Sequence, residues 1–249
     1  MEYGEQLAEG KTKLIYAHPS DPGRAFMVQK DSISAGDGAR RNEIAGKGAI
    51  SGRTAANVFA LLNSEGVRTH YHADPAPGVM EVERCAMLPL EVVMRRRATG
   101  SYCRRHPEID EGSRFEPVLV EFFIKDDANH DPQVWAEDIV ARDLASLDEV
   151  RWIETEGTRV FEILERRWAR QDVELIDLKI EFGRAADGQL IVADMIDNDS
   201  WRLWPGGDKA QMLDKQIYRN MPNVTDEGLE GLKRKYEEVR DLTEEFRKG

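Results

Sequence analysis

Two carboxylates and a lysine stand at alternate positions in one stretch of the chain. Residues 176–182 alternate strictly between apolar and charged side chains, which is the two-residue period of a half-buried β-strand. On such a strand Asp177, Lys179 and Glu181 share one face. Carboxylates there can bind a cation, and the lysine can bind a phosphate or a carboxylate.

A β-hairpin signal follows this strand and places a further carboxylate near it. Asp187-Gly188 precedes a second apolar run that ends at Asp194. With a two-residue turn, Glu181 faces Asp194 across the hairpin, at a Cβ separation of roughly 5 Å where like charges repel. A bound cation would explain the pair, and two carboxylates without thiolate or imidazole favour Mg²⁺. A surface hairpin with a solvated charged face is the alternative.

Two glycine-containing segments near the N-terminus can approach an anionic ligand. In Gly10-Lys11-Thr12-Lys13, glycine admits close backbone approach and the lysines supply positive charge, although the spacing is not that of a Walker A loop. A charged strand edge is the alternative. The loop 31–40 offers amides and side chains to a ligand, with Ser34, Asp37 and Arg40 as candidates, or it is an ordinary glycine-rich turn.

Arginines mark two further segments. Arg95 and Arg97 share one face of a predicted strand that leads to Ser101, and arginine binds carboxylate or phosphate with two hydrogen bonds. Arg202 lies between two tryptophans that can form a wall of an anion site or simply pack in the core. A solvated basic edge is the alternative for 95–97, and no interleaved aromatic residues support a nucleic-acid patch there.

A dense polar cluster follows another predicted strand. Lys125 can bind a phosphate, and Asp127 or Asp131 can position a metal ion or an amine. His130 lacks a second histidine or cysteine that would support a zinc site. A loop built on Asn, Asp and Pro is the alternative.

Composition limits the class of protein. The chain has 249 residues, 41% of them hydrophobic and 33% charged, with a net charge of −12 that argues against general nucleic-acid binding. No apolar run approaches the ~20 residues that span a bilayer, and the N-terminus lacks the features of a signal peptide. Cys85 and Cys103 form neither a disulfide framework nor a zinc spacing, so we expect a reducing cytoplasm and no membrane.

The hydrophobic pattern predicts an α+β protein with antiparallel sheets and packed helices. Two long helices are expected after Ser146, with Glu149 completing a capping box, and after Thr225. A helix is also expected over 40–65. Strands are predicted over the ranges 7–17, 24–30, 68–72, 79–87, 91–97 and 118–124.

Taken in order, these motifs resemble the SAICAR synthetase family, and the resemblance covers nearly the whole chain. The segments that carry it are Gly10-Lys11-Thr12-Lys13, Ser34 to Arg40, Arg97 to Ser101, Lys125-Asp126-Asp127, Asp177 to Gly183, and Asp199-Ser200 through Arg202-Leu203-Trp204 to Asp214-Lys215. Met195 stands where many bacterial members have glutamate, and the surrounding residues look more like the synthetase portion of the animal bifunctional enzyme. No carboxylase domain is present in the sequence.

The resemblance implies a two-lobed, ATP-grasp-like fold, with a β-rich nucleotide-binding lobe over 1–88 and a second lobe over 89–249. It implies ATP-dependent ligation of L-aspartate to carboxyaminoimidazole ribonucleotide (CAIR), with Mg²⁺, in purine biosynthesis. The sequence allows a homo-oligomer.

The resemblance also implies roles for individual residues, and these stand beside the readings above. ATP would contact Gly10, Lys11, Lys13, Met87 and Lys125; Mg²⁺ would be held by Glu181 and Asp194; the ribonucleotide would meet Arg95, Ser101 and Arg202; aspartate would meet Ser34, Asp37 and Arg40; and Lys125, Lys179 and Asp177 would serve catalysis.

The implied reaction needs an activated carboxylate, because oxide is a poor leaving group. Transfer of the γ-phosphoryl group would give an acyl phosphate, which the amine of aspartate then attacks, and this needs charge neutralisation more than a protein nucleophile. Asp127, Asp131 and Asp177 are open alternatives for the base. A small-molecule kinase and a nucleotide-binding protein without turnover are the rival functions.

Overall fold

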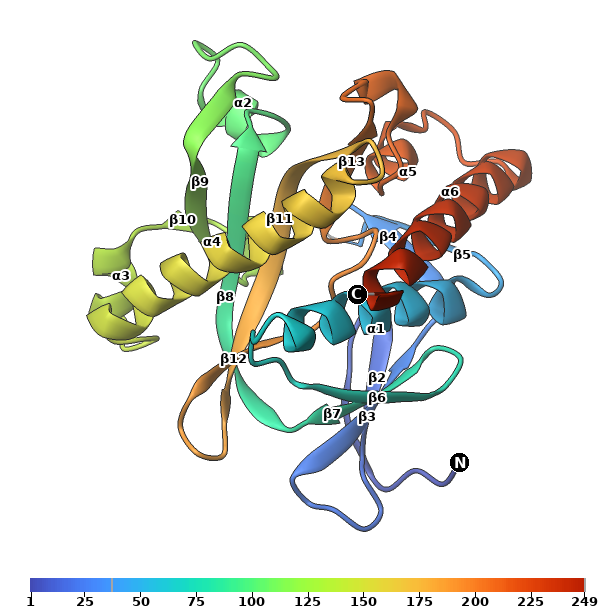
Figure 1. Cartoon of the computed structure of the whole chain (residues 1–249), viewed down its shortest axis with the longest axis vertical. Coiled ribbons are helices and arrows are strands. Elements are labelled where there is room, and N and C mark those ends of the chain that lie inside the picture. Colours follow the sequence, from blue (N-terminus) through green and yellow to red (C-terminus); the bar gives the residue numbers. More distant parts are fainter. Residues whose placement is uncertain (37, 249) are drawn as a thin grey trace.

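The computed structural model describes residues 1–36 and 38–248, and it contains two antiparallel sheets with helices packed on them (Figure 1). The first sheet has the order β1-β2-β3-β7-β6, with β1 (Gln6–Glu9), β2 (Lys13–Ala17), β3 (Arg24–Gln29), β6 (Tyr71–Ala76) and β7 (Val79–Glu83). A separate hairpin pairs β4 (Ser32–Ala35) with β5 (Arg40–Glu43). The α+β class with antiparallel sheets is confirmed.

The second sheet is built around one long strand. Its order is β10-β9-β8-β11-β12, with β8 (Cys85–Arg97), β9 (Arg114–Ile124), β10 (Gln133–Val134), β11 (Val173–Ala185) and β12 (Leu190–Ala193). β11 pairs with β8 along one edge, and with β13 (Trp201–Pro205) and then β12 along the other. β11 is therefore a central strand that is flanked over most of its length.

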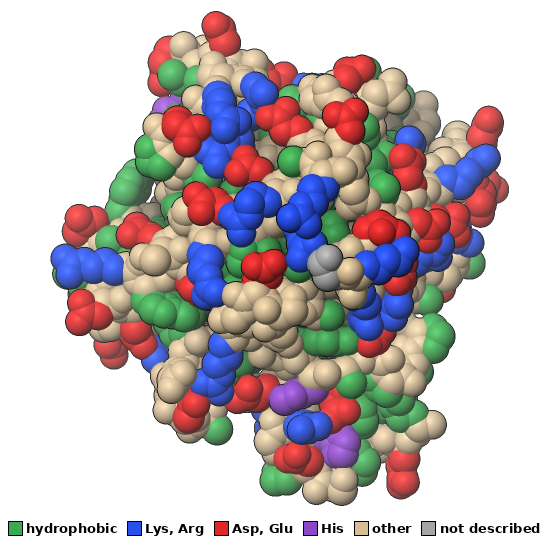
Figure 2. All heavy atoms as spheres, in the orientation of Figure 1, with side chains coloured by type: hydrophobic (Ala, Val, Ile, Leu, Met, Phe, Trp, Pro, Cys, Tyr) green, Lys and Arg blue, Asp and Glu red, His purple; other side chains and the backbone are tan. Residues whose placement is uncertain are grey.

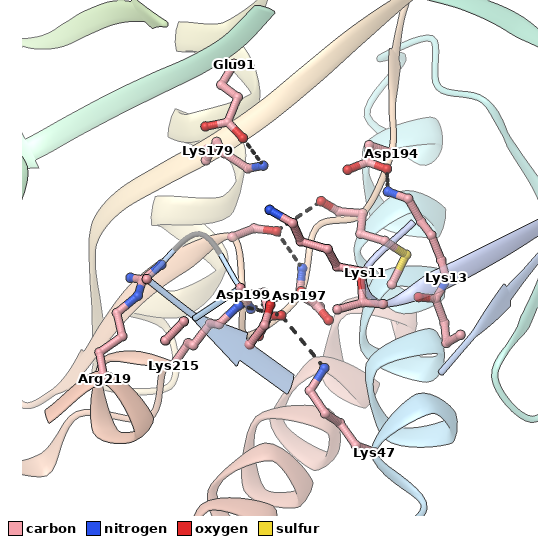
Figure 3. Close-up of a pocket in the computed structure, with 18 of the residues that line it drawn as sticks. Lys11, Lys13, Lys47, Glu91, Lys179, Asp194, Asp197, Asp199, Lys215 and Arg219 are labelled. Carbon is pink, nitrogen blue, oxygen red and sulfur yellow. Dashed lines mark hydrogen bonds and ion pairs between the residues drawn. The ribbon is translucent and has the colours of Figure 1, made fainter. Parts of the chain in front are cut away.

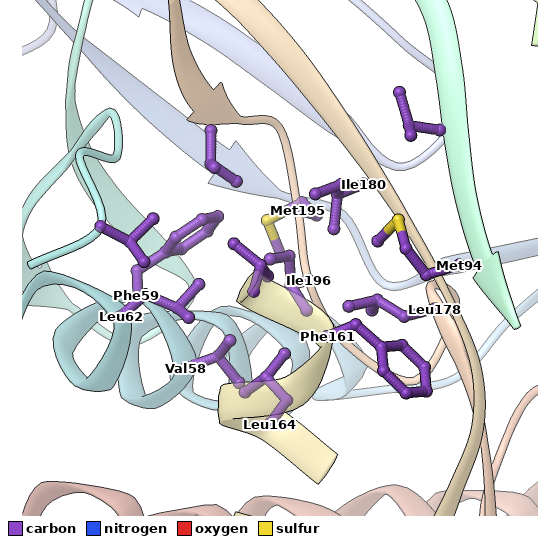
Figure 4. Close-up of a cluster of buried hydrophobic side chains, with 14 of the residues drawn as sticks. Val58, Phe59, Leu62, Met94, Phe161, Leu164, Leu178, Ile180, Met195 and Ile196 are labelled. Atoms are coloured by element: carbon purple, nitrogen blue, oxygen red, sulfur yellow. The ribbon is translucent and has the colours of Figure 1, made fainter. Parts of the chain in front are cut away.

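Helices cover these sheets and carry the core. α4 (Leu147–Ala169) crosses the second sheet, whereas α1 (Lys47–Ser64) lies on the first sheet with α6 (Asp226–Glu244) beside it (Figure 1). Figure 4 shows side chains of α1, α4 and β11 meeting in one apolar cluster, which includes Phe59, Phe161 and Ile180, each 0% exposed. The short elements are α2 (Ser101–Arg105), η1 (Asp127–Asn129), α3 (Ala136–Ala141), η2 (Lys209–Gln211), α5 (Gln216–Asn220) and η3 (Glu245–Lys248).

Both long helices begin where their capping residues predict. The Ser146 hydroxyl accepts a hydrogen bond from the Glu149 N–H, and the Glu149 carboxylate accepts one from the Ser146 N–H. The Thr225 hydroxyl accepts from the Gly228 N–H at 3.1 Å. Trp168, on the predicted apolar stripe of α4, is fully buried.

The predicted helix over 40–65 is partly wrong. Residues 40–43 form β5, and α1 begins only at Lys47, after Gly46 with φ +84°. A glycine readily adopts this left-handed conformation, so Gly46 turns the chain from the hairpin into the helix. The strands expected at 79–87 and 91–97 are instead β7 and the long β8.

Within residues 1–36 and 38–248, no helix has the length and apolar character that a membrane crossing requires. Cys85 and Cys103 are both free thiols, as expected.

Candidate functional site

The β11–β12 hairpin differs by one residue from its predicted register. Glu181 pairs with Ala193, because three residues, 186–188, form the turn, with Gly188 at φ +83°. The prediction that Glu181 directly faces Asp194 is therefore wrong. Asp194 lies just past the end of β12, with φ +66°.

The charged face of β11 is also more enclosed than a half-buried strand would be. Asp177 and Glu181 are only 4% and 2% exposed. Burying a carboxylate is unfavourable unless it is paired, so the partners of these two side chains define the site.

Despite the shifted register, Glu181 and Asp194 line one pocket. This mainly apolar pocket of about 430 Å³ lies between the first sheet and the start of β8. Its lining includes the apolar side chains of Ile15, Ala25, Met27, Val82 and Met87 together with Gly10, Lys13, His70, Lys125, Glu181 and Asp194. Six residues predicted to bind ATP or Mg²⁺ therefore share this apolar pocket.

Two lysines neutralise Glu181. Its carboxylate lies 2.6 Å from the Lys125 ammonium and 3.0 Å from that of Lys179, and Lys179 also contacts Glu91 at 2.8 Å. Burial alone would raise the pKa of Glu181, but the charges of Lys179 and Lys125 outweigh burial and lower the pKa to about 2. Glu181 is thus anionic at any physiological pH.

Lys13 forms an ion pair with Asp194 and stands where the apolar pocket meets a second pocket. Burial lowers the pKa of Lys13 to about 8, although the charge of Glu181 opposes this effect. Its positive charge is therefore sensitive to mildly alkaline pH.

The second pocket, of about 320 Å³, is polar and rich in lysine (Figure 3). Its charged lining residues are Lys11, Lys13, Lys47, Glu91, Asp131, Lys179, Asp194, Asp197, Asp199, Lys215 and Arg219. Figure 2 shows one face of the molecule, on which Lys and Arg side chains are interspersed with Asp and Glu.

A buried network that the sequence did not reveal forms one wall of the polar pocket. Asp199 accepts a hydrogen bond from the Tyr236 hydroxyl at 2.9 Å and from Lys215 at 3.1 Å, and the Lys47 ammonium lies 3.8 Å away. Burial opposes ionisation of Asp199, but Lys47 and Lys215 lower its pKa below the ordinary value. Lys47 is only 2% exposed. These residues come from α1, α6 and two loops. Asp199 and Lys215 lie in segments that carry the family resemblance, but no local sequence pattern indicates that they meet Lys47 and Tyr236.

A third pocket, of about 340 Å³, adjoins the polar pocket and contains arginines. It is lined by Arg95, Ser101 and Arg105, and it shares Glu91 and Asp131 with the polar pocket. We refer to it as the arginine pocket. The polar pocket therefore adjoins both the apolar pocket and the arginine pocket.

Buried carboxylates hold the arginines in place. Asp177 accepts from Arg95 at 2.9 Å and also pairs with Arg202, while Glu121 accepts from Arg95 at 2.6 Å and pairs with Arg105. Arg202 lines a smaller cavity of about 80 Å³ beside Gly100 rather than the arginine pocket itself. Trp201 and Trp204, which flank Arg202 in the sequence, are buried.

The predicted aspartate-binding loop is only partly accounted for. Ser34 lines the polar pocket, but Arg40 donates to the backbone carbonyls of Tyr218 and Met221 at 3.0 and 2.8 Å and lines none of the three pockets. Arg40 therefore fastens the β4–β5 hairpin to α5. Asp37 and the side chain of Asp127 lie outside the described part of the chain.

Within the described residues no group of three or more His, Cys, Asp or Glu side chains is arranged to hold a metal ion. Glu181 and Asp194 remain as a pair of carboxylates in the apolar pocket. Mg²⁺ is usually bound through one or two carboxylates, substrate phosphate and water, so this pair fits such an ion.

Curated proteins from bacteria and animals are similar to this chain in sequence. The chain is 75% identical over 247 residues to phosphoribosylaminoimidazole-succinocarboxamide synthase of Herpetosiphon aurantiacus, covering 99% of this chain and all of that protein. It is 46% identical over 239 residues to the bifunctional phosphoribosylaminoimidazole carboxylase/phosphoribosylaminoimidazole succinocarboxamide synthetase of Drosophila melanogaster, covering 94% of this chain and 56% of that protein. The likeness to the animal enzyme is real, but bacterial relatives are more similar.

Solved structures give the same result. A structure described as SAICAR synthetase (Type-2) in complex with ADP superimposes with a TM-score of 0.86 at 32% identity, covering 95% of this chain and 96% of that one. The family model for SAICAR synthetase matches residues 6–235. The chain therefore belongs to the SAICAR synthetase family.

Proposed function

We propose that this protein ligates L-aspartate to CAIR with cleavage of ATP, giving SAICAR, ADP and phosphate in de novo purine biosynthesis. The observation that carries the proposal is the row of three adjoining pockets, which are apolar, lysine-rich and arginine-containing in turn. An adenine ring suits the apolar pocket, a triphosphate with an amino acid suits the lysine-rich polar pocket, and a phosphorylated ribonucleotide suits the arginine pocket. The family membership and the ADP-bound relative support the assignment.

The apolar pocket would take the nucleotide. The adenine would lie against apolar side chains that include Met87, and the segment 83–88 would form the hinge beside it. Gly10 permits close approach of the backbone, while Lys13 and Lys125 supply charge for the phosphates, and Lys11 does so from the adjoining polar pocket.

Glu181 and Asp194 would hold Mg²⁺ beside the phosphates. Their fit rests on two oxygen donors in one pocket, of which Glu181 is ionised and nearly fully buried. When bound, the ion would neutralise phosphate charge. Lys13 pairs with Asp194, and Lys125 and Lys179 pair with Glu181.

The arginine pocket would take the ribonucleotide through Arg95 and Ser101, with Arg202 alongside. Both arginines contact the buried Asp177 carboxylate, which fixes the directions of their guanidinium groups. We infer that Asp177 acts by positioning these cations. Ser34 would contribute to the aspartate side from the polar pocket.

The chemistry would proceed through an acyl phosphate. The CAIR carboxylate attacks the γ-phosphorus, ADP leaves, and the amine of aspartate then displaces phosphate to form the amide. Lys179 stands between the nucleotide and ribonucleotide ends of the site, and with Lys125 it offers positive charge to the transferring group.

We further infer that residues 1–88 and 89–249 act as the two lobes on either side of the nucleotide, and that the protein works in the cytoplasm. The boundary at residue 88 falls within β8. Two free cysteines are consistent with a reducing compartment.

The test is to measure ADP release with each substrate omitted in turn. SAICAR and ADP should form together only when ATP, aspartate and CAIR are all present. Rapid sustained ADP release without aspartate would favour a small-molecule kinase, and ATP binding without turnover under every condition would favour a binding protein.

A further inference from the structure

The carboxylates that line the polar pocket differ in how their charge is compensated. Glu91 is 2.8 Å from Lys179, Asp194 pairs with Lys13, and Asp199 is 3.1 Å from Lys215. Asp197 makes no comparable ion pair with a described residue. The Asp199 N–H donates to its carboxylate at 2.9 Å, and the Ser51 hydroxyl is its other neutral donor.

Asp197 is nearly enclosed, yet it lines the polar pocket. It is 4% exposed, and its backbone N–H donates to the Ser200 hydroxyl at 3.2 Å, which fixes the loop on which it stands. Figure 3 shows Asp197 and Asp199 side by side, with Lys47 and Lys215 pointing toward them. The lysines satisfy Asp199, so the charge of Asp197 is the less stabilised of the two.

We propose that Asp197 is the general base that accepts a proton from the α-ammonium group of aspartate. The inference rests on the proposed function. An ammonium group entering the polar pocket would find in Asp197 a carboxylate that forms no close ion pair with a described residue, next to Asp199, which pairs with two lysines.

The proton and bond balance is as follows. The α-ammonium gives one proton to the Asp197 carboxylate, and the freed lone pair attacks the carbonyl carbon of the acyl phosphate. The C–N bond forms, the C–O bond to phosphate breaks with its electron pair, and inorganic phosphate leaves. The second proton on nitrogen and the proton on Asp197 pass to solvent.

The electrostatic surroundings favour proton uptake by Asp197. Burial and the adjacent charge of Asp199 raise its pKa above the ordinary value, while Lys47 opposes this. Groups on the elements packed around it are Lys47 and Ser51 of α1, Lys13 of β2 and Tyr236 of α6. Two neighbouring carboxylates with pKa values pushed apart are a recurrent arrangement in acid–base catalysis.

Other candidates for the base have weaker claims. Asp177 pairs with the guanidinium groups of Arg95 and Arg202 and does not line the polar pocket. Asp131 also lines the polar pocket, but it is less buried and accepts the Asp126 N–H at 2.7 Å. Asp131 is therefore the rival that the experiment must separate from Asp197.

The test compares two nucleophiles in the same enzyme. Hydroxylamine is a largely neutral nucleophile near neutral pH, so it should trap the acyl phosphate as a hydroxamate without a base. Asp197→Asn should lower kcat with aspartate by roughly 100-fold or more and leave hydroxamate formation close to the wild-type rate. Asp131→Asn should lower the two rates in the same proportion, if at all.

Asp214→Asn is a matched control, because Asp214 is 1% exposed and accepts only backbone N–H groups at 3.1 and 2.8 Å, away from the polar pocket. It should not change the ratio of the two rates. A ratio that changes in Asp131→Asn rather than in Asp197→Asn would overturn the proposal, as would equal loss of both rates in Asp197→Asn.

A measurement on the unmodified enzyme guards against a variant that fails to fold. With saturating aspartate, kcat should fall as acidification protonates Asp197, whereas hydroxamate formation, normalised to neutral hydroxylamine, should not. An identical acid limb for both nucleophiles would refute the proposal. Absence of hydroxamate from the wild-type enzyme would instead refute the acyl phosphate of the proposed function.

Discussion

Replacement of Glu181 by glutamine tests the electrostatic core of the site. The substitution keeps the size of the side chain and a carbonyl oxygen, but removes the charge that Lys125 and Lys179 share at 2.6 and 3.0 Å. Lys179 keeps Glu91 as a partner, whereas Lys125 is 43% exposed and can be solvated. The loss should therefore be smaller than that of an isolated buried pair.

The magnitude follows from the pKa of Glu181. A fall from the ordinary 4.5 to about 2 corresponds, at 1.36 kcal/mol for each unit, to about 3 kcal/mol of stability as an upper value. Because the folded-state pKa is the lower one, this stabilisation is complete above pH 4.5 and is lost as the pH falls toward 2. We expect Glu181→Gln to lower the free energy of unfolding by about 2 kcal/mol at neutral pH, with no change in that difference down to pH 5.

The assay is urea unfolding at several pH values, combined with turnover as a function of Mg²⁺ concentration. Turnover should fall by orders of magnitude while the variant remains folded. Glu174→Gln is a matched control on the same strand, because Glu174 pairs with Arg97 at 2.7 Å and lines none of the three pockets. It should lower stability by less than about 1 kcal/mol. Equal effects of the two substitutions, or normal Mg²⁺-dependent turnover in Glu181→Gln, would refute the reasoning.

Three further outcomes are expected. Since the pKa of Lys13 is about 8, kcat/KM for ATP should decline above pH 8 as the ammonium loses its proton. Lys13→Arg should abolish this alkaline decline in the pH–rate profile, because arginine keeps its charge. Gly52→Ala should destabilise the protein by about 1–3 kcal/mol in thermal unfolding, because the added Cβ would lie 2.8 Å from the backbone of the β6–β7 turn. Gly231→Ala is the control: a Cβ there meets open space, and the substitution should stabilise α6 by about 0.5–1 kcal/mol. Tyr236→Phe removes the 2.9 Å hydrogen bond to Asp199 and should lower the urea midpoint by an amount equivalent to about 1–2 kcal/mol, with a larger effect on KM for aspartate than on KM for ATP.

Local patterns predicted the elements whose causes are local. The alternation of residues 176–182 and the capping residues Ser146 and Thr225 act through neighbours in sequence, and the structure contains the strand and both helices. The hairpin register was mispredicted, because Asp187-Gly188 fits either a two-residue turn or the three-residue turn observed. A single added turn residue shifts every pairing of β12 by one.

The wall of the polar pocket was beyond sequence reasoning for a physical reason. Lys47 and Tyr236 meet Asp199 only because α1 and α6 pack together, and each residue separately reads as an ordinary member of its helix. Arg40 is a converse case. It was predicted to contact aspartate, whereas in the structure its guanidinium donates to backbone carbonyls of the α5 region.

The central strand of the second sheet also sets the distances within the site. Three charged residues follow one another along β11. Asp177 pairs with Arg95 of the arginine pocket, Lys179 lines the polar pocket, and Glu181 lines the apolar pocket. Two residues of strand measure about 7 Å, so backbone geometry alone holds the α-carbons of Asp177 and Glu181 about 14 Å apart. Insertion or deletion of one residue between them would turn the side chains on one side of the change to the opposite face of the sheet. Relatives of different length should therefore have gained or lost residues outside this interval.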